Sequence, residues 1–131
     1  MKFRLEQIDH IALNVRDVAR STAWYQEVLG LERRFAEHWP MPVALGAGST
    51  WLALFAAADN EPLPSKGKIG FRHLAFRVSR DNFEKAQIEL RSRGIPFEFE
   101  DHGIAHSIYF RDPDGHELEL TTYELKAKPG E

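Results

Sequence analysis

The chain of 131 residues contains no cysteine, so disulfides and thiolate metal ligands are both excluded. Any bound metal would have to be held by histidine, aspartate or glutamate. No apolar run approaches the roughly 20 residues that a membrane-spanning helix needs. The first six residues, Met1-Lys2-Phe3-Arg4-Leu5-Glu6, lack the apolar segment of a signal peptide. These absences favour a cytoplasmic protein that is not embedded in a membrane.

The chain also lacks an excess of positive charge. It has 17 Lys and Arg residues against 20 Asp and Glu residues, a formal net charge of -3. Without a basic surface, nucleic acid and anionic membranes are not expected partners. The length and the 43% hydrophobic content suit one globular domain with its own core, which leaves a small molecule as the expected partner.

What the sequence does contain is an internal repeat. His10 and His73 lie 63 residues apart within similar alternating segments, and Ala53 corresponds to Glu119 in a second matching pair. The matching segments are Asp9–Val15 with Arg72–Val78, and Trp51–Leu54 with Glu117–Leu120. A repeat sets the architecture of a fold, and here it also places two histidines at equivalent positions.

The first copy of the repeat, about residues 7–57, is predicted to contain one helix and four strands. Asp17 is a suitable N-cap for the helix, and Gly30 a suitable stop. The expected elements are a strand at 7–15, the helix between Asp17 and Gly30, and strands at 31–38, 41–46 and 50–57. Residues 58–69 are rich in proline, glycine and polar residues and are interpreted as a linker.

The second copy, about residues 70–123, is predicted to repeat this order, with a loose tail at 124–131. Its helix should begin at about Asp81, with Glu84 as the capping-box partner. The run Asp112-Pro113-Asp114-Gly115 predicts a tight turn that His116 completes. The expected elements are a strand at 70–78, the helix at 81–93, and strands at 97–100, 106–111 and 116–123.

Residues 1–131 are thus expected to form one α+β domain of two βαβββ modules. Successive strand residues face opposite sides of a sheet. If the flanking leucines, isoleucines and valines pack on the helices, then His10, His73 and Glu119 all face away from them. The predicted arrangement is a curved, cavity-enclosing mixed sheet with the helices on its outer face.

The motifs together resemble the vicinal oxygen chelate superfamily, which includes glyoxalase I, extradiol dioxygenases, fosfomycin-resistance enzymes and bleomycin-resistance proteins. The resemblance extends from about residue 7 to residue 123. Its motifs are Asp9–Val15, Trp24-Tyr25 with Leu29-Gly30-Leu31, Arg72–Phe76 and Tyr109–Leu120. It implies that His10, His73 and Glu119 bind one divalent metal, which could be Fe(II), Mn(II), Ni(II) or Zn(II).

The resemblance leaves several reactions open. Glyoxalase I has a fourth protein ligand where this chain has Ala53, so ring cleavage of a chelating substrate by a dioxygenase-like enzyme is favoured. A glyoxalase-type lyase and a fosfomycin-type thiol transferase are the alternatives. The thiol transferases carry a threonine, a lysine and a serine at positions held here by Ala12, Phe99 and Gly103. A metal-free sequestering protein of the bleomycin-resistance type is a further alternative.

The same resemblance suggests roles for further residues. Tyr109 is the candidate for proton transfer or substrate orientation. Because successive strand residues face opposite sides of a sheet, His106 is expected on the opposite face from Tyr109. His38 and His102 are expected on the surface. The candidate substrate pocket comprises Trp51, Ala53, Phe55 and Ser107. Small members of the superfamily generally pair their modules between chains, so a homodimer with shared sites is expected.

Overall fold

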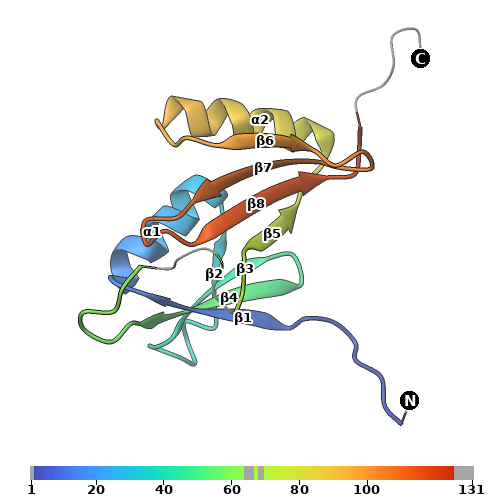
Figure 1. Cartoon of the computed structure of the whole chain (residues 1–131). Coiled ribbons are helices and arrows are strands. Elements are labelled where there is room, and N and C mark those ends of the chain that lie inside the picture. Colours follow the sequence, from blue (N-terminus) through green and yellow to red (C-terminus); the bar gives the residue numbers. More distant parts are fainter. Residues whose placement is uncertain (1, 64–66, 68–69, 126–131) are drawn as a thin grey trace, which may run out of the picture. The chain divides into compact units, whose positions relative to one another are not determined.

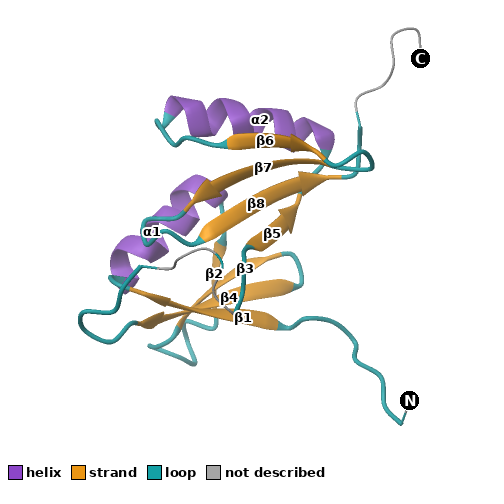
Figure 2. Cartoon of the chain, in the orientation of Figure 1, coloured by secondary structure: helices purple, strands orange, loops and turns teal. Residues whose placement is uncertain are grey.

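In a computed structural model, the chain divides into two compact units, Met1–Pro62 (module 1) and Leu63–Glu131 (module 2). The structure describes residues 2–63, 67 and 70–125. Within these residues each module contains a strand, a helix and three further strands, as Figures 1 and 2 show. The predicted α+β fold of two βαβββ modules is therefore confirmed.

Module 1 contains a four-stranded mixed sheet and one helix. Its elements are β1 (His10–Val15), α1 (Val18–Leu29), β2 (Glu32–Arg34), β3 (Val43–Ala47) and β4 (Thr50–Ala56). The strand order is β1-β4-β3-β2, with β1 parallel to β4 and the other pairs antiparallel. Tyr25 of α1 is fully buried together with Leu45 and Leu54 of the sheet, so the core of this module lies between them.

Module 2 repeats this topology. Its elements are β5 (Leu74–Arg77), α2 (Arg80–Ser92), β6 (Glu98–Asp101), β7 (His106–Arg111) and β8 (Glu117–Thr122). The strand order is β5-β8-β7-β6, again with one parallel pair, between β5 and β8. Phe83 of α2 is buried together with Ile108 and Leu118. The helix thus covers one face of the sheet and leaves the other face to the polar residues.

The two helices begin and end differently from one another. Asp17 accepts a hydrogen bond from the Arg20 amide at 3.0 Å, and Gly30 has a φ of 67°, so the predicted cap and stop of α1 are confirmed. The predicted start of α2, at about Asp81, agrees with the structure to within one residue: Ser79 is the N-cap and accepts from the Asn82 amide, so the helix begins at Arg80.

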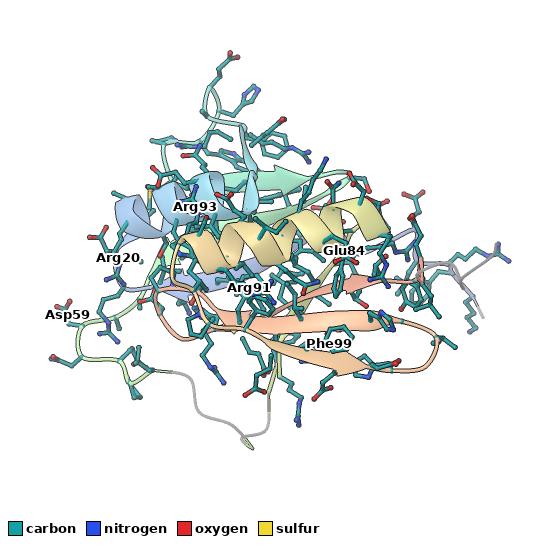
Figure 3. All side chains as sticks on the ribbon, turned by 90° about the horizontal axis from the view of Figure 1, so that it is seen from above. Arg20, Asp59, Glu84, Arg91, Arg93 and Phe99 are labelled. Atoms are coloured by element: carbon teal, nitrogen blue, oxygen red, sulfur yellow. The ribbon has the colours of Figure 1, made fainter. Side chains whose placement is uncertain are left out.

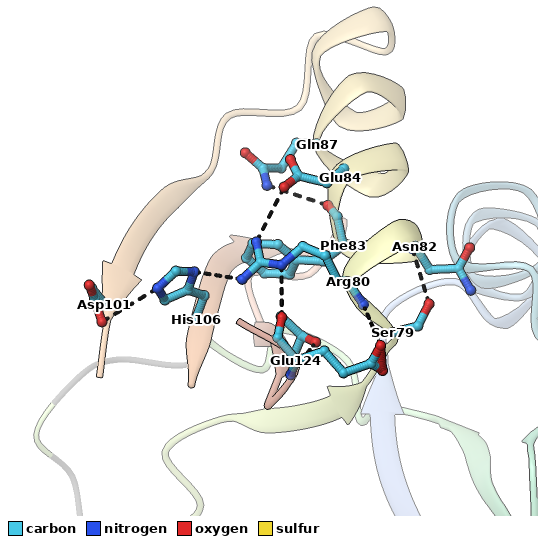
Figure 4. Close-up of polar contacts among 10 residues, drawn as sticks. Ser79, Arg80, Asn82, Phe83, Glu84, Gln87, Asp101, His106 and Glu124 are labelled. Atoms are coloured by element: carbon cyan, nitrogen blue, oxygen red, sulfur yellow. Dashed lines mark hydrogen bonds and ion pairs between the residues drawn. The ribbon is translucent and has the colours of Figure 1, made fainter. Parts of the chain in front are cut away.

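The predicted capping role of Glu84 is wrong, because Ser79 is the N-cap and the capping-box position is therefore Asn82. The Glu84 carboxylate instead accepts a hydrogen bond from Arg80 at 3.2 Å (Figure 4). The same guanidinium contacts His106 at 2.7 Å and donates to the Glu124 carbonyl at 2.8 Å. Arg80 and Glu84 thus form an ion pair between residues four apart on the helix. His106 therefore lies on the helix side of its sheet, as parity predicts.

Several strands are shorter than predicted. The strand expected at 31–38 ends at Arg34, because Phe35 adopts a left-handed backbone with φ 58° and its carbonyl accepts from the amides of His38 and Trp39. The strands expected from residues 7 and 70 begin at His10 and Leu74. Part of the predicted linker and most of the predicted tail lie outside the described residues. No helix among the residues that the structure describes is long and apolar enough to cross a membrane.

The predicted tight turn between β7 and β8 is confirmed. The Gly115 amide donates to the Asp112 carbonyl at 3.0 Å, and Gly115 has a φ of 84°. The buried Asp112 carboxylate accepts from the amides of Asp114 and His116, and its second oxygen lies 2.8 Å from His116 Nδ1. This hydrogen bond is the main cause that raises the pKa of His116 above 6.5. The turn fixes the start of the strand that carries Glu119.

The hydrogen bond between His116 and Asp112 predicts a pH-dependent contribution to the stability of the fold. Because the pKa of His116 is raised on folding, its contribution is fully present below about pH 6.5 and is lost as pH rises through the folded value. We expect His116→Gln to lower the free energy of unfolding by on the order of 1 kcal/mol at pH 5.5 to 6, and by less at pH 9. Urea unfolding with a chelator present measures both. In an Asp112→Asn background the pH dependence of the loss should be much smaller, because the main cause of the raised pKa is removed. An equal loss at both pH values in the protein that retains Asp112 would contradict this account.

Candidate metal centre

A histidine–glutamate pair lies on the face of module 2 that is turned away from α2. Nε2 of His73 lies 2.9 Å from Oε1 of Glu119, whose residue is only 8% exposed. The other carboxylate oxygen accepts a hydrogen bond from the Ser107 hydroxyl at 2.6 Å. Ser107 is fully buried, and this hydrogen bond restricts the orientation of the Glu119 carboxylate; its predicted place in a substrate pocket stays a prediction.

The strand register explains how the sequence brings these groups together. Glu119 pairs with Ala75 on one side, two residues after His73, and with Tyr109 on the other. Directly paired residues share one face of a sheet. In module 1 the equivalent parallel pair is Ala12 with Ala53. The register thus confirms that Ala53 is the counterpart of Glu119, and module 1 has no carboxylate at this position.

Tyr109 completes the polar group in module 2. Its ring lies edge-on to the His73 ring, with centroids 5.7 Å apart. Its hydroxyl lies 2.9 Å from Nε2 of His102, in the turn after β6. Burial, followed by the negative charges of Glu119 and Glu100, raises the pKa of Tyr109 above 10, so the phenol keeps its proton at neutral pH.

His10 occupies the corresponding position in module 1. Its Nδ1 lies 2.7 Å from a carboxylate oxygen of Asp9, and its ring stacks on Trp51 with centroids 4.3 Å apart. A carboxylate only accepts, so Nδ1 carries the ring proton when His10 is neutral, and the lone pair lies on Nε2. Carboxylate–histidine pairs of this kind commonly orient histidine ligands of metals.

The donor set fits a divalent metal. Two ligand atoms that each bind an ion at about 2.1 Å, at right angles, lie roughly 3 Å apart, close to the observed separation of His73 and Glu119. Within the described residues no group of three or more His, Asp or Glu side chains is found that could hold a metal. The His73–Glu119 pair belongs to module 2 and His10 to module 1, so the three-ligand set stays a prediction.

The predicted pocket residues of module 1 lie on one face. Trp51, Ala53 and Phe55 are paired with His10, Ala12 and Asn14 of β1. Ala53 is 2% exposed, whereas Phe55 is 42% exposed. Trp51 also contacts two aromatic rings that the sequence reading missed, those of Phe35 and Trp39, at 5.3 and 5.7 Å between centroids. These rings come from the turn that follows β2, whose conformation strand parity does not predict.

The face around Tyr109 is acidic. Glu98 pairs with Tyr109, and Glu100 pairs with Ser107, so both share a face with Glu119. Phe99 (Figure 3) pairs instead with Ile108 and contacts Phe83 of α2, with centroids 6.4 Å apart. The position at which the thiol transferases carry a lysine is therefore filled by a side chain that points to the helix.

A family profile and the sequences of known relatives agree with the fold described above. The profile of the glyoxalase/bleomycin resistance protein/dioxygenase superfamily matches residues 7–120. The glutathione transferase FosA of Serratia marcescens is 30% identical over 124 residues, which are 95% of this chain and 86% of FosA. The metallothiol transferase FosB of Staphylococcus epidermidis is 32% identical over 126 residues, which are 93% of this chain and 87% of FosB.

A solved structure shows the same likeness in three dimensions. The crystal structure of a glyoxalase/dioxygenase from Nostoc punctiforme superimposes with a TM-score of 0.75 at 26% identity and covers 92% of each chain. The fold is that of the glyoxalase-like proteins. The chain belongs to the glyoxalase/bleomycin resistance protein/dioxygenase superfamily.

Proposed function

We propose that the protein is a metal-dependent enzyme that adds a small thiol to an electrophile with two neighbouring oxygens, such as an epoxide with a second oxygen group beside the ring. The observation that carries the proposal is the His73–Glu119 pair beside Tyr109, in a chain 30% and 32% identical to two thiol transferases. The name of one of these relatives, metallothiol transferase, also supports metal dependence. The sequence alone favoured ring cleavage; these relatives favour the thiol-transferase alternative.

His10, His73 and Glu119 would hold the ion. When bound, a divalent metal supplies a Lewis acid that polarises the oxygens of the substrate. In the proposed reaction the thiol sulfur forms a bond to an epoxide carbon, the carbon–oxygen bond breaks, and its electron pair stays on the oxygen. The thiol releases its proton to solvent, and Tyr109 donates its phenolic proton to that oxygen and is reprotonated from solvent, so the number of protons balances.

The charges near Tyr109 bear on the substrate. Glu98 and Glu100 share its face, and Phe99 points to the helix side. Like charges repel, so this face disfavours a strongly anionic electrophile such as a phosphonate. A neutral or cationic epoxide is the electrophile that this chain suits better.

The test is a panel of substrates offered to protein purified anaerobically and reloaded separately with Mn(II), Fe(II), Ni(II) and Zn(II). We expect a low-molecular-weight thiol to be consumed only when an epoxide and a metal are both present. Removal of the metal with a chelator should abolish the reaction, and return of the metal should restore it. Oxygen uptake with catechols, or isomerisation of a hemithioacetal, with no thiol addition would sink the proposal.

Ring cleavage remains the second candidate. It is favoured by Ala53, because a site with three protein ligands leaves coordination positions open for a chelating substrate. It requires molecular oxygen as a co-substrate, which thiol addition does not. Oxygen consumption in the presence of Fe(II) and a catechol therefore distinguishes the two.

We also propose that the active form is a homodimer. β1 and β5 are edge strands of their sheets, and His10 lies on β1 while His73 immediately precedes β5. Edge strands carry backbone groups that can pair with another chain. Pairing β1 of one copy with β5 of the other would give two equivalent sites, each with ligands from both copies.

The homodimer predicts a molar mass of twice the 15.0 kDa of one chain in light scattering. Mixing a His10→Ala variant with a Glu119→Ala variant should restore one intact site per mixed dimer, because each copy then supplies what the other lacks. Both variants alone should be inactive. A monomer that binds metal at every concentration would show that the modules pair within one chain.

A further inference from the structure

His102 lies beside the proposed site without a role in the reaction described above. Its Nε2 lies 2.9 Å from the hydroxyl of Tyr109, and the two rings meet edge-on with centroids 6.3 Å apart. Strand alternation does not predict this contact, because His102 lies in the turn between β6 and β7. Its side chain is 41% exposed, so the contact joins the site to solvent.

The surrounding charges decide which partner donates the proton. An oxygen of Glu100 lies 3.6 Å from the same Nε2, and a carboxylate favours a proton on the nitrogen that faces it. Glu119 pairs directly with Tyr109 across β7 and β8, and its carboxylate can only accept hydrogen bonds, so it favours the phenol proton on its own side. The Tyr109 oxygen therefore accepts from Nε2–H of His102, and its own proton points toward the carboxylate side.

We propose that His102 is a positioning residue that fixes the direction of the Tyr109 hydroxyl proton. The inference deepens the proposed function and rests on it for its catalytic consequence. The O–H bond of a phenol lies near the ring plane and can point to either of two sides, so a donor that occupies one side of the oxygen selects the other for the proton. When His102 donates to the Tyr109 oxygen, the O–H bond of Tyr109 points away from His102 and toward the His73–Glu119 pair. Pre-orientation of this kind lowers the reorganisation that the proton transfer requires.

The kinetic test compares two substitutions of His102. We expect His102→Leu to lower kcat about tenfold, with KM and metal content unchanged, because one neutral hydrogen bond is lost. His102→Gln keeps an N–H donor near the position of Nε2 and should retain most of the activity. His106→Gln is the control, because His106 contacts Arg80 on the opposite face of the same sheet; it should leave kcat unchanged.

A double-mutant cycle separates positioning from a general structural effect. In a Tyr109→Phe background, His102→Leu should cause no further loss of kcat, because the hydroxyl that it positions is gone. A full tenfold loss in that background, or unchanged kcat for His102→Leu alone, would overturn the inference.

A measurement that needs no catalytic turnover tests the hydrogen bond between His102 and Tyr109. Its outcome does not depend on the proposed function. In metal-free protein, nitrogen NMR of the imidazole should show neutral His102 with its proton on Nε2, and Tyr109→Phe should shift that nitrogen resonance. An unshifted resonance, or a proton on Nδ1, would overturn the inference. If the wild-type protein adds no thiol to any epoxide, the proposed function fails, and the nitrogen shift still decides whether His102 positions Tyr109.

Discussion

His73→Ala is expected to abolish most metal binding. Its Nε2 is one of three proposed ligand atoms and lies 2.9 Å from the Glu119 carboxylate. Loss of a group that only supports a ligand typically costs about 10- to 100-fold in metal affinity, so loss of a ligand should cost at least about 100-fold. Metal content after dialysis, together with the affinity from titration, measures the effect.

The control for this variant is another histidine of module 2. His106→Ala removes an imidazole that contacts Arg80 on the helix side, and it should leave metal affinity unchanged. Circular dichroism should show that both variants are folded. Full metal occupancy of folded His73→Ala would contradict the assignment of His73 as a ligand.

Tyr109→Phe is expected to lower turnover by about 10²- to 10⁴-fold, the usual contribution of a general acid or base. The substitution removes only the hydroxyl, while the ring contact with His73 is preserved. Metal content and KM should therefore stay close to the wild-type values. Steady-state kinetics with a thiol and an epoxide, combined with metal analysis of the same samples, measures both.

The matched control is Tyr123→Phe, which removes a hydroxyl from a residue that is 56% exposed just beyond β8. It should leave turnover unchanged. Turnover of Tyr109→Phe at the wild-type rate would remove Tyr109 from the mechanism. A parallel loss of metal would instead assign it to the support of Glu119.

The elements that local sequence rules govern were predicted well. Asp17 and Gly30 bound α1 as their side-chain and backbone chemistry predicts. The rules failed where a competing contact decides the outcome. Phe35 ends β2 by entering a left-handed conformation that a sequence does not predict for phenylalanine, and Ser79 caps α2 in place of Asp81, so Glu84 lies beyond the capping-box position.

The candidate site was predictable to the extent that strand register determines it. Alternation placed His73, Glu119 and Tyr109 on one face, and the structure brings these three residues together in module 2. Alternation does not reach side chains in turns, so the contact of His102 with Tyr109 was missed. The ligation of a metal by His10 together with this group, and the pairing of the modules, stay predictions.

The central claim is that two imidazoles and one carboxylate bind a single divalent ion. X-ray absorption of the metal-loaded protein after exhaustive dialysis counts the imidazole ligands directly. The account predicts one ion per chain with two imidazole ligands, and one imidazole in the His10→Ala variant. A site with no imidazole, or a spectrum of wild-type protein that His10→Ala and His73→Ala both leave unchanged, would contradict it.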